Sequence, residues 1–204
     1  MTETIPHSEP SRKTIAVFGA GPGLGRAVAK RYADEGYTVC LVARRQEQLV
    51  RMADELSDKG AKVHVVAGDL LQADSVAGVA RQVRDRVGHL DALYYAPTPD
   101  AGFVPAVNLT AQQAQASMPL SYYTLVSLVQ AFLPDMLERG DGAILTAQGA
   151  SSVQGLPYDN VTVTLFAADP NLSTGVKVAA MPPRWGDDAA LIAGGMVAGV
   201  GAIA

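Results

Sequence analysis

Short apolar runs alternate with longer amphipathic segments along most of this chain. The apolar runs contain many β-branched residues, which is typical of strands buried on both faces of a parallel sheet. They occupy residues 14–18, 38–42, 62–67, 91–96, 142–147 and 161–166. Apolar residues spaced three and four apart predict helices in residues 26–32, 46–58, 72–87 and 111–138. Alternating strands and helices predict an α/β fold with a doubly wound parallel sheet.

The two ends of the chain differ from this pattern. Residues 1–12 are polar and contain Pro6 and Pro10, so we expect a flexible N-terminal tail without an apolar signal segment. Residues 176–178 predict one more short strand. Residues 189–204 are apolar and rich in glycine but too short to predict a membrane span. We expect residues 13–204 to form a single domain with a shortened C-terminal part.

A glycine-rich turn joins the first predicted strand to the first predicted helix. The glycines stand at alternate positions: Gly19, Gly21, Gly23 and Gly25. Glycines at such a place permit a tight turn and a close approach of backbone to a pyrophosphate, and the following helix N-terminus favours an anion. Strand, glycine turn and helix together predict a Rossmann-like dinucleotide site. A glycine turn that binds nothing is the alternative.

The glycine spacing resembles that of the short-chain dehydrogenase/reductase family. The match is Gly19-x-x-x-Gly23-x-Gly25, and Phe18 stands where the family usually has threonine. The resemblance covers residues 14–152. It implies a dinucleotide cofactor and a small substrate carrying a carbonyl or hydroxyl group.

Two arginines follow the second predicted strand. In a doubly wound sheet this strand end meets the adenosine ribose, where an acid suits a free 2′-hydroxyl and an arginine suits a 2′-phosphate. Arg44 and Arg45 stand here without an acid, so the sequence favours NADP (NADPH) over NAD. Of the two, Arg44 is the stronger candidate, because the solvated start of the next helix is an alternative explanation for Arg45.

The resemblance extends the expected cofactor site to two further strand ends. Asp69 and Leu70 match the acid and hydrophobe that lie along the adenine, although Asp69 also suits the N-cap of the helix in residues 72–87. After residues 91–96 the family's N-N-A-G is absent, and only a backbone contact from Ala96 is implied. The expected cofactor-binding residues are therefore Gly19, Gly21, Gly23, Leu24, Gly25, Arg44, Arg45, Asp69, Leu70 and Ala96.

The family's catalytic residues are incompletely matched. Its serine aligns with Gly149 without gaps, so Ser151 or Ser152 would take its place only after a shift of two or three residues. Tyr158 stands for the family's tyrosine, but Thr162 stands four residues later, where the pattern Tyr-x-x-x-Lys requires lysine. The family's asparagine that holds a water in the proton relay aligns near Pro119 and is missing here. Serine and tyrosine would bind the substrate oxygen, and Ser151 and Tyr158 are the catalytic candidates.

Composition excludes several other classes of protein. The 204 residues are 49% hydrophobic and 18% charged, which is typical of a globular chain. A formal charge of −4 gives no reason to expect nucleic acid or a membrane surface as a partner. The single cysteine, Cys40, builds no disulfide framework and predicts a cytoplasmic location. No spacing of residues predicts a metal site.

Three functions remain open on this sequence. The first is an NADP-dependent oxidoreductase that acts on a carbonyl or alcohol. The second is a non-catalytic relative that binds the dinucleotide as a regulatory or structural subunit, and the missing Tyr-x-x-x-Lys favours this function and the third. The third is non-redox chemistry in a pocket formed by tyrosines: Tyr94, Tyr95, Tyr122 and Tyr123. The resemblance also implies a homo-oligomer through the helix in residues 111–138.

Overall fold

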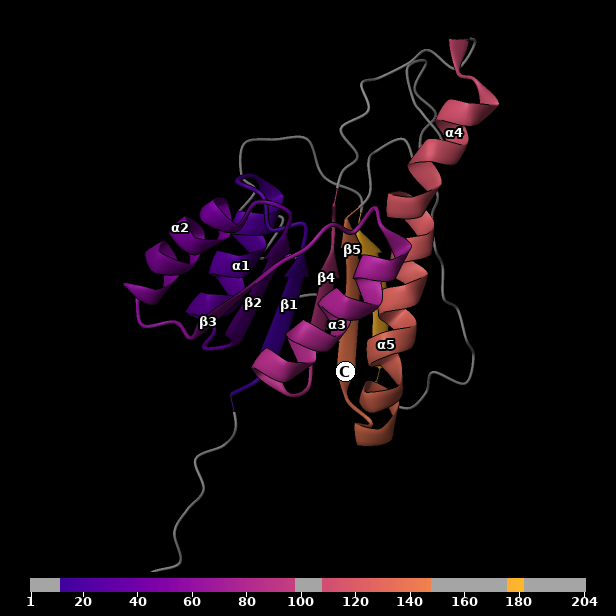
Figure 1. The fold of residues 1–204 in the computed structure, drawn as a ribbon. Helices are drawn as coiled ribbons and strands as arrows, with labels where there is room; N and C mark the ends of the chain where they lie inside the picture. Colours follow the sequence, from indigo (N-terminus) through magenta and orange to yellow (C-terminus); the bar gives the residue numbers. More distant parts are fainter. Residues whose placement is uncertain (1–11, 98–107, 148–175, 182–204) are drawn as a thin grey trace, which may run out of the picture.

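A parallel sheet is the centre of the computed structural model, which describes residues 12–97, 108–147 and 176–181. In these ranges six strands pair in the order β3-β2-β1-β4-β5-β6 (Figure 1). The strands are β1 (Thr14–Phe18), β2 (Thr38–Ala43), β3 (Val63–Ala67), β4 (Ala92–Tyr95), β5 (Gly142–Ala147) and β6 (Val176–Met181). The strand order reverses between β1 and β4, which is the position where ligands bind in such sheets. The predicted doubly wound α/β fold is confirmed.

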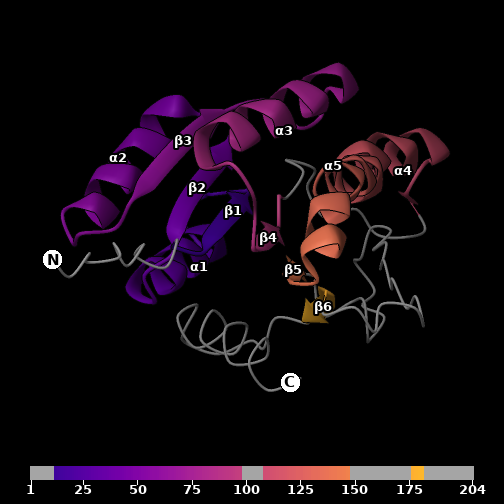
Figure 2. The ribbon, with the colours of Figure 1, turned by 90° about the horizontal axis from the view of Figure 1, so that it is seen from below.

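Helices cover both faces of the sheet, which explains why its strands are continuously apolar. The helices α1 (Leu24–Asp34) and α2 (Gln46–Ser57) pack on one face, and α3 (Ala73–Val87) and α5 (Thr124–Arg139) pack on the other (Figure 2). Along β1, Ile15 and Val17 face the first pair, whereas Phe18 faces the second. All three side chains are fully buried. A polar residue at any of these positions would lose its hydrogen bonds to water.

The long helix predicted for residues 111–138 is confirmed, because the chain is helical from Ala111 to Arg139, but one π-helical turn within it was not expected. It consists of α4 (Ala111–Met118), the π-helical turn η2 (Pro119–Tyr123) and α5. Pro119 has no backbone N–H and cannot complete a regular turn, and the N–H of Thr124 instead donates to the Pro119 carbonyl five residues before it. Helix α4, which precedes η2, has no buried residue and extends past the carboxyl ends of the strands (Figure 1).

The sixth strand lies late in the chain. Residues 161–166 lie outside the described residues, whereas the short strand expected at 176–178 is confirmed as part of β6. β6 pairs in parallel with β5, from Gly142 opposite Val176 to Ala147 opposite Met181. Among the described residues, no helix has the length and hydropathy needed to cross a membrane.

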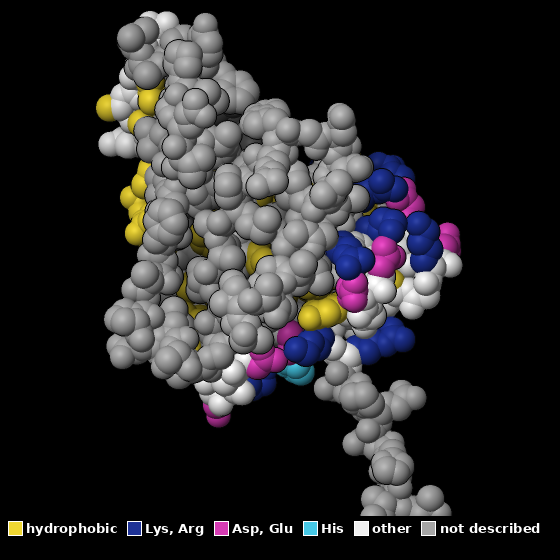
Figure 3. Space-filling view, turned by 180° about the vertical axis from the view of Figure 1, so that it is seen from behind, with side chains coloured by type: hydrophobic (Ala, Val, Ile, Leu, Met, Phe, Trp, Pro, Cys, Tyr) yellow, Lys and Arg dark blue, Asp and Glu magenta, His cyan; other side chains and the backbone are white. Residues whose placement is uncertain are grey.

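Charges of both signs alternate on the surface of α1 and α2. Figure 3 shows Lys and Arg interspersed with Asp and Glu on this side of the molecule. Three exposed ion pairs contribute: Arg26–Glu55 at 2.7 Å, Lys30–Asp34 at 2.5 Å and Arg31–Glu35 at 2.6 Å. Because opposite charges are so close, these helices present no single-sign field to a charged macromolecule.

Candidate functional site

The glycine turn after β1 folds back against the end of β2. The N–H groups of Gly19 and Ala20 both donate to the Val42 carbonyl, at 3.0 and 3.1 Å. Gly19 has φ +90°, and a Cβ on it would lie 2.7 Å from the Pro97 nitrogen. Only glycine satisfies both the left-handed backbone and the close approach of the β4 exit. The turn therefore brings the ends of β1, β2 and β4 together.

Gly25 allows helix α1 to start directly against this turn. A Cβ on Gly25 would lie 2.3 Å from the Gly19 carbonyl oxygen, whereas one on Gly23 would have no atom within 4 Å. Gly23 is the N-cap of α1, and Leu24 is its first residue. These three residues set the position of the helix N-terminus and do not line the pocket described next.

A pocket of about 230 Å³ opens at the carboxyl ends of the first four strands. Seven of the predicted cofactor-binding residues line it: Gly19, Gly21, Arg44, Arg45, Asp69, Leu70 and Ala96. The sequence reasoning missed the other seven: Ala20, Ala43, Gln48, Gly68, Leu71, Pro97 and Leu120. Gln48 had a usable signal, because it lies in the first turn of a helix that starts after Arg45. Leu120 had none, since its position depends on the π-helical turn.

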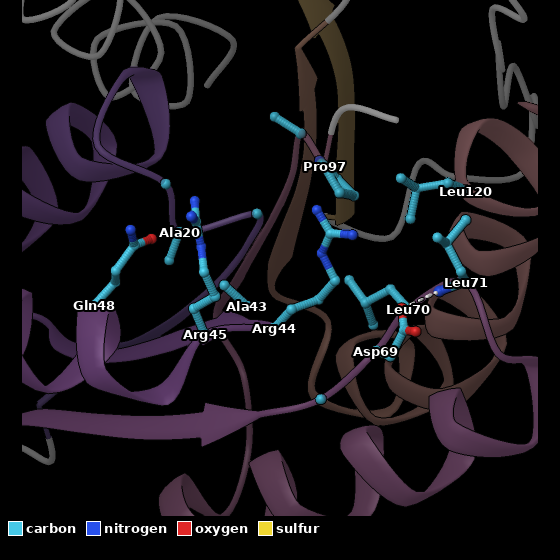
Figure 4. A pocket seen from close by; sticks show the side chains of 14 residues that line it. Ala20, Ala43, Arg44, Arg45, Gln48, Asp69, Leu70, Leu71, Pro97 and Leu120 are labelled. Carbon is cyan, nitrogen blue, oxygen red and sulfur yellow. Dashed lines mark hydrogen bonds between the residues drawn. The ribbon is translucent and has the colours of Figure 1, made fainter. Parts of the chain in front are cut away.

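One side of the pocket is basic. Arg44 reaches across the floor of the pocket toward Pro97, and Arg45 stands beside Ala20 and Gln48 (Figure 4). Arg45 is the N-cap of α2, and its carbonyl accepts the N–H groups of Gln48 and Leu49, both at 3.2 Å. Two guanidinium groups at a helix N-terminus form a site suited to a phosphate.

The opposite side is apolar and is formed by the β3–α3 connection together with η2. Leu70 is buried, Leu71 is 41% exposed, and Leu120 lies beside Leu71 on the same side of the pocket (Figure 4). An Asx turn holds this connection, since Asp69 Oδ1 accepts the Leu71 N–H at 3.0 Å. The alternative N-cap role for Asp69 was wrong, because the N-cap of α3 is Gln72, one turn further on. Asp69 is the one carboxylate among the described lining residues.

The predicted catalytic residues Ser151 and Tyr158 lie outside the described residues. The tyrosine pocket finds no support in the described part of the chain. Tyr94 and Tyr95 are buried in opposite faces of the sheet, and Tyr123 is 57% exposed. Tyr122 contacts Tyr123 edge to face, with ring centroids 5.4 Å apart. None of the four lines the pocket.

The pocket has the chemistry of a site for a phosphorylated nucleotide. Its apolar side offers a flat base the contacts of Leu70 and Leu120, and its basic side offers a phosphate two guanidinium groups. The glycine turn lets a diphosphate approach the backbone, because Gly21 lacks a side chain at the pocket wall. The residues therefore fit a dinucleotide that carries an additional phosphate near Arg44 and Arg45.

Comparison with known proteins relates this chain to a family of enzymes. A family model described as short chain dehydrogenase matches residues 13–164. Sulfoacetaldehyde reductase 2 of Chromohalobacter salexigens is 29% identical over 71% of this chain and 56% of its own length. The L-sorbose reductase of Gluconobacter frateurii, solved with NADPH and L-sorbose, is 30% identical over 73% of this chain and 57% of its own, with a TM-score of 0.67.

A second solved structure covers more of this chain and has the same fold. A metagenomic short-chain oxidoreductase solved with NADP is 21% identical, covers 92% of this chain and 90% of its own, and superposes with a TM-score of 0.79. The chain spans about half the length of the curated relatives it matches, from 51% to 56% for the first three. The glycine turn, the strand order and the family match over residues 13–164 agree, and the chain belongs to the short chain dehydrogenase family.

Proposed function

We propose that this protein is an NADP-dependent oxidoreductase that acts on a small carbonyl or alcohol substrate. The observation that carries the proposal is the pair Arg44 and Arg45 at the end of β2, both lining the pocket where an NAD-specific site would carry an acid. The NADPH complex of the L-sorbose reductase supports this choice of cofactor.

The chain's own residues bind and orient the cofactor in this proposal. Arg44 and Arg45 would hold the 2′-phosphate, Leu70 would contact the adenine, and the glycine turn at Gly19 and Gly21 would approach the pyrophosphate. The nicotinamide supplies or accepts the hydride when the cofactor is bound. Ser151 and Tyr158 remain the candidates for binding the substrate oxygen.

A second function is a dinucleotide-binding relative that transfers no hydride. A lysine one helical turn after the tyrosine normally lowers the phenol pKa, so that proton exchange occurs near neutral pH. Here Thr162 follows Tyr158 at that spacing, and Gly149 occupies the serine position. These substitutions favour binding without turnover.

We also propose that two copies associate through residues 111–138. The family resemblance supports this proposal, and the segment exposes two large apolar side chains, Tyr123 of η2 at 57% and Leu137 of α5 at 41%. We expect neither nucleic acid nor a membrane as a partner, and a cytoplasmic location stays a prediction.

The decisive experiment is a fluorescence titration with NADPH and with NADH. We expect Arg44→Ala to weaken NADPH binding about tenfold and to change NADH binding little, because only NADPH carries the 2′-phosphate. Arg45→Ala should show the same selectivity to a smaller extent. Arg51→Ala is the matched control, since Arg51 is exposed on α2 and does not line the pocket. Failure of both nucleotides to bind would refute the proposal.

A screen of carbonyl substrates then separates the two functions. Turnover that falls a hundredfold or more, the scale of a positioned acid, in Tyr158→Phe supports the enzyme. Binding of NADPH without turnover of any carbonyl would support the non-catalytic relative.

A further inference from the structure

Two buried hydroxyl groups lie behind the apolar side of the pocket. Tyr95, the last residue of β4, donates from its phenol to the Leu120 carbonyl in the π-helical turn η2. Thr124 Oγ1, at the start of α5, donates to the Leu70 carbonyl at 2.7 Å. Leu70 and Leu120 both line the pocket. Each hydroxyl therefore holds the backbone of one wall residue.

The Tyr95 phenol is held in its protonated form. Burial raises the pKa of Tyr95, and the Thr124 side chain offsets a part of that rise. The phenol thus stays protonated and remains a donor at all physiological pH values. Tyr95 is 5% exposed and Thr124 is 4% exposed, so water does not compete for these bonds.

These bonds connect segments that are far apart in the sequence. The β3–α3 connection carries Leu70, and η2 carries Leu120, about fifty residues later. Among the described residues, η2 itself makes no hydrogen bond to the β3–α3 connection. The bond from Thr124, which follows η2 directly as the first residue of α5, joins the two segments. The π-helical turn matters here, because it places the Leu120 carbonyl within reach of β4.

We propose that Tyr95 and Thr124 are positioning residues that couple the β3–α3 connection to η2, so that the apolar wall of the pocket moves as one unit. The ligand in question is the dinucleotide of the proposed function, on which this part of the inference rests. A nucleotide base seated on Leu70 then stabilises η2, although η2 contributes only Leu120 to the pocket.

The test combines three substitutions with NADPH titration and hydrogen exchange measured by mass spectrometry. Tyr95→Phe and Thr124→Val should each raise the Kd for NADPH about fivefold, since each loses one buried hydrogen bond. Thr124→Ser keeps the hydroxyl and should bind as the wild type does. The double variant should be no weaker than about one single variant, because the two bonds act as a unit.

Tyr94→Phe is the matched control. The Tyr94 hydroxyl is fully buried and has no hydrogen-bond partner among the described residues, so its removal should leave NADPH binding unchanged. Hydrogen exchange reads the coupling without any ligand. In Tyr95→Phe, exchange should rise in residues 68–72 as well as in residues 119–124, whereas Tyr94→Phe should change neither segment.

The outcomes separate this inference from the proposed function. NADPH binding by the wild type together with unchanged affinity in Tyr95→Phe and Thr124→Val would overturn the inference and leave the function standing. If the wild type binds no nucleotide, the proposed function fails, and the exchange experiment alone decides the coupling. Faster exchange confined to residues 119–124 in Tyr95→Phe would overturn it.

Discussion

Gly25 shows how a single hydrogen atom in place of a side chain determines the shape of the pocket. A methyl group at this position would lie 2.3 Å from the Gly19 carbonyl oxygen, and that oxygen belongs to the backbone of the turn. We expect Gly25→Ala to lower the free energy of unfolding by about 2 kcal/mol, because backbone has no rotamer by which to move away. The same shift of the turn should weaken NADPH binding. Urea denaturation and nucleotide titration measure the two effects.

Gly78→Ala is the matching control for this substitution. Gly78 lies within α3, where a Cβ would have no atom within 4 Å. Alanine there should raise the free energy of unfolding by up to about 1 kcal/mol through helix propensity and leave nucleotide binding unchanged. Equal stability of Gly25→Ala and the wild type would show that the turn is more adaptable than its geometry indicates.

At the scale of elements, Arg84 connects α3 with α5, the two helices that cover the same face of the sheet. Its guanidinium donates to the Ala131 carbonyl at 2.5 Å, lies 5.6 Å from the ring centre of Phe132 and approaches Asp135 to 3.5 Å. Pro134 interrupts the hydrogen bonding of α5 beside this carbonyl, since proline donates none. Arg84→Ala should therefore cost about 1–2 kcal/mol of unfolding free energy.

We expect that lysine cannot take over the role of Arg84, because its ammonium group lacks the planar shape with which a guanidinium donates hydrogen bonds and stacks on an aromatic ring at the same time. Arg84→Lys is expected to lose most of the stability that Arg84→Ala loses, whereas Arg81→Ala, at an exposed position of the same helix, should change stability by less than about 0.5 kcal/mol. Thermal unfolding of the three variants measures this ranking. A stable Arg84→Ala protein would assign the α3–α5 contact to apolar packing alone.

The elements themselves were largely predictable, and the exceptions have physical causes. β1 and β5 have the bounds predicted from their apolar runs, because strands covered on both faces consist almost entirely of apolar residues. Arg44 and Arg45 could be assigned to the pocket because they follow a strand directly. Leu120 could not, since one additional residue per turn at Pro119 changes which side chain faces the pocket, and no periodicity signals that change.

At the scale of the whole molecule, the two ends of the parallel strands differ in function. The pocket lies at the carboxyl ends of the strands, and a polar cluster around Asp91 connects β1, β4 and α5 at the amino ends. Asp91 accepts the Thr14 N–H at 2.6 Å and its hydroxyl at 3.2 Å, and Arg139 approaches it to 3.9 Å. The pocket and the Asp91 cluster are therefore separated by the length of β1, which is about 13 Å for four residue steps.

This separation makes stability and binding independently variable. Asp91→Ala should lower the free energy of unfolding by about 2 kcal/mol, because its 13% exposed carboxylate is the shared acceptor of the cluster. Asp141→Ala should cost less than about 0.5 kcal/mol, since Asp141 is 62% exposed and forms a surface ion pair with Lys13. NADPH at about 100 times its Kd should add about 2.7 kcal/mol to both variants and to the wild type alike. Denaturation with and without NADPH measures this increase in unfolding free energy. A smaller increase in Asp91→Ala than in the wild type would show that the Asp91 cluster is coupled to the pocket.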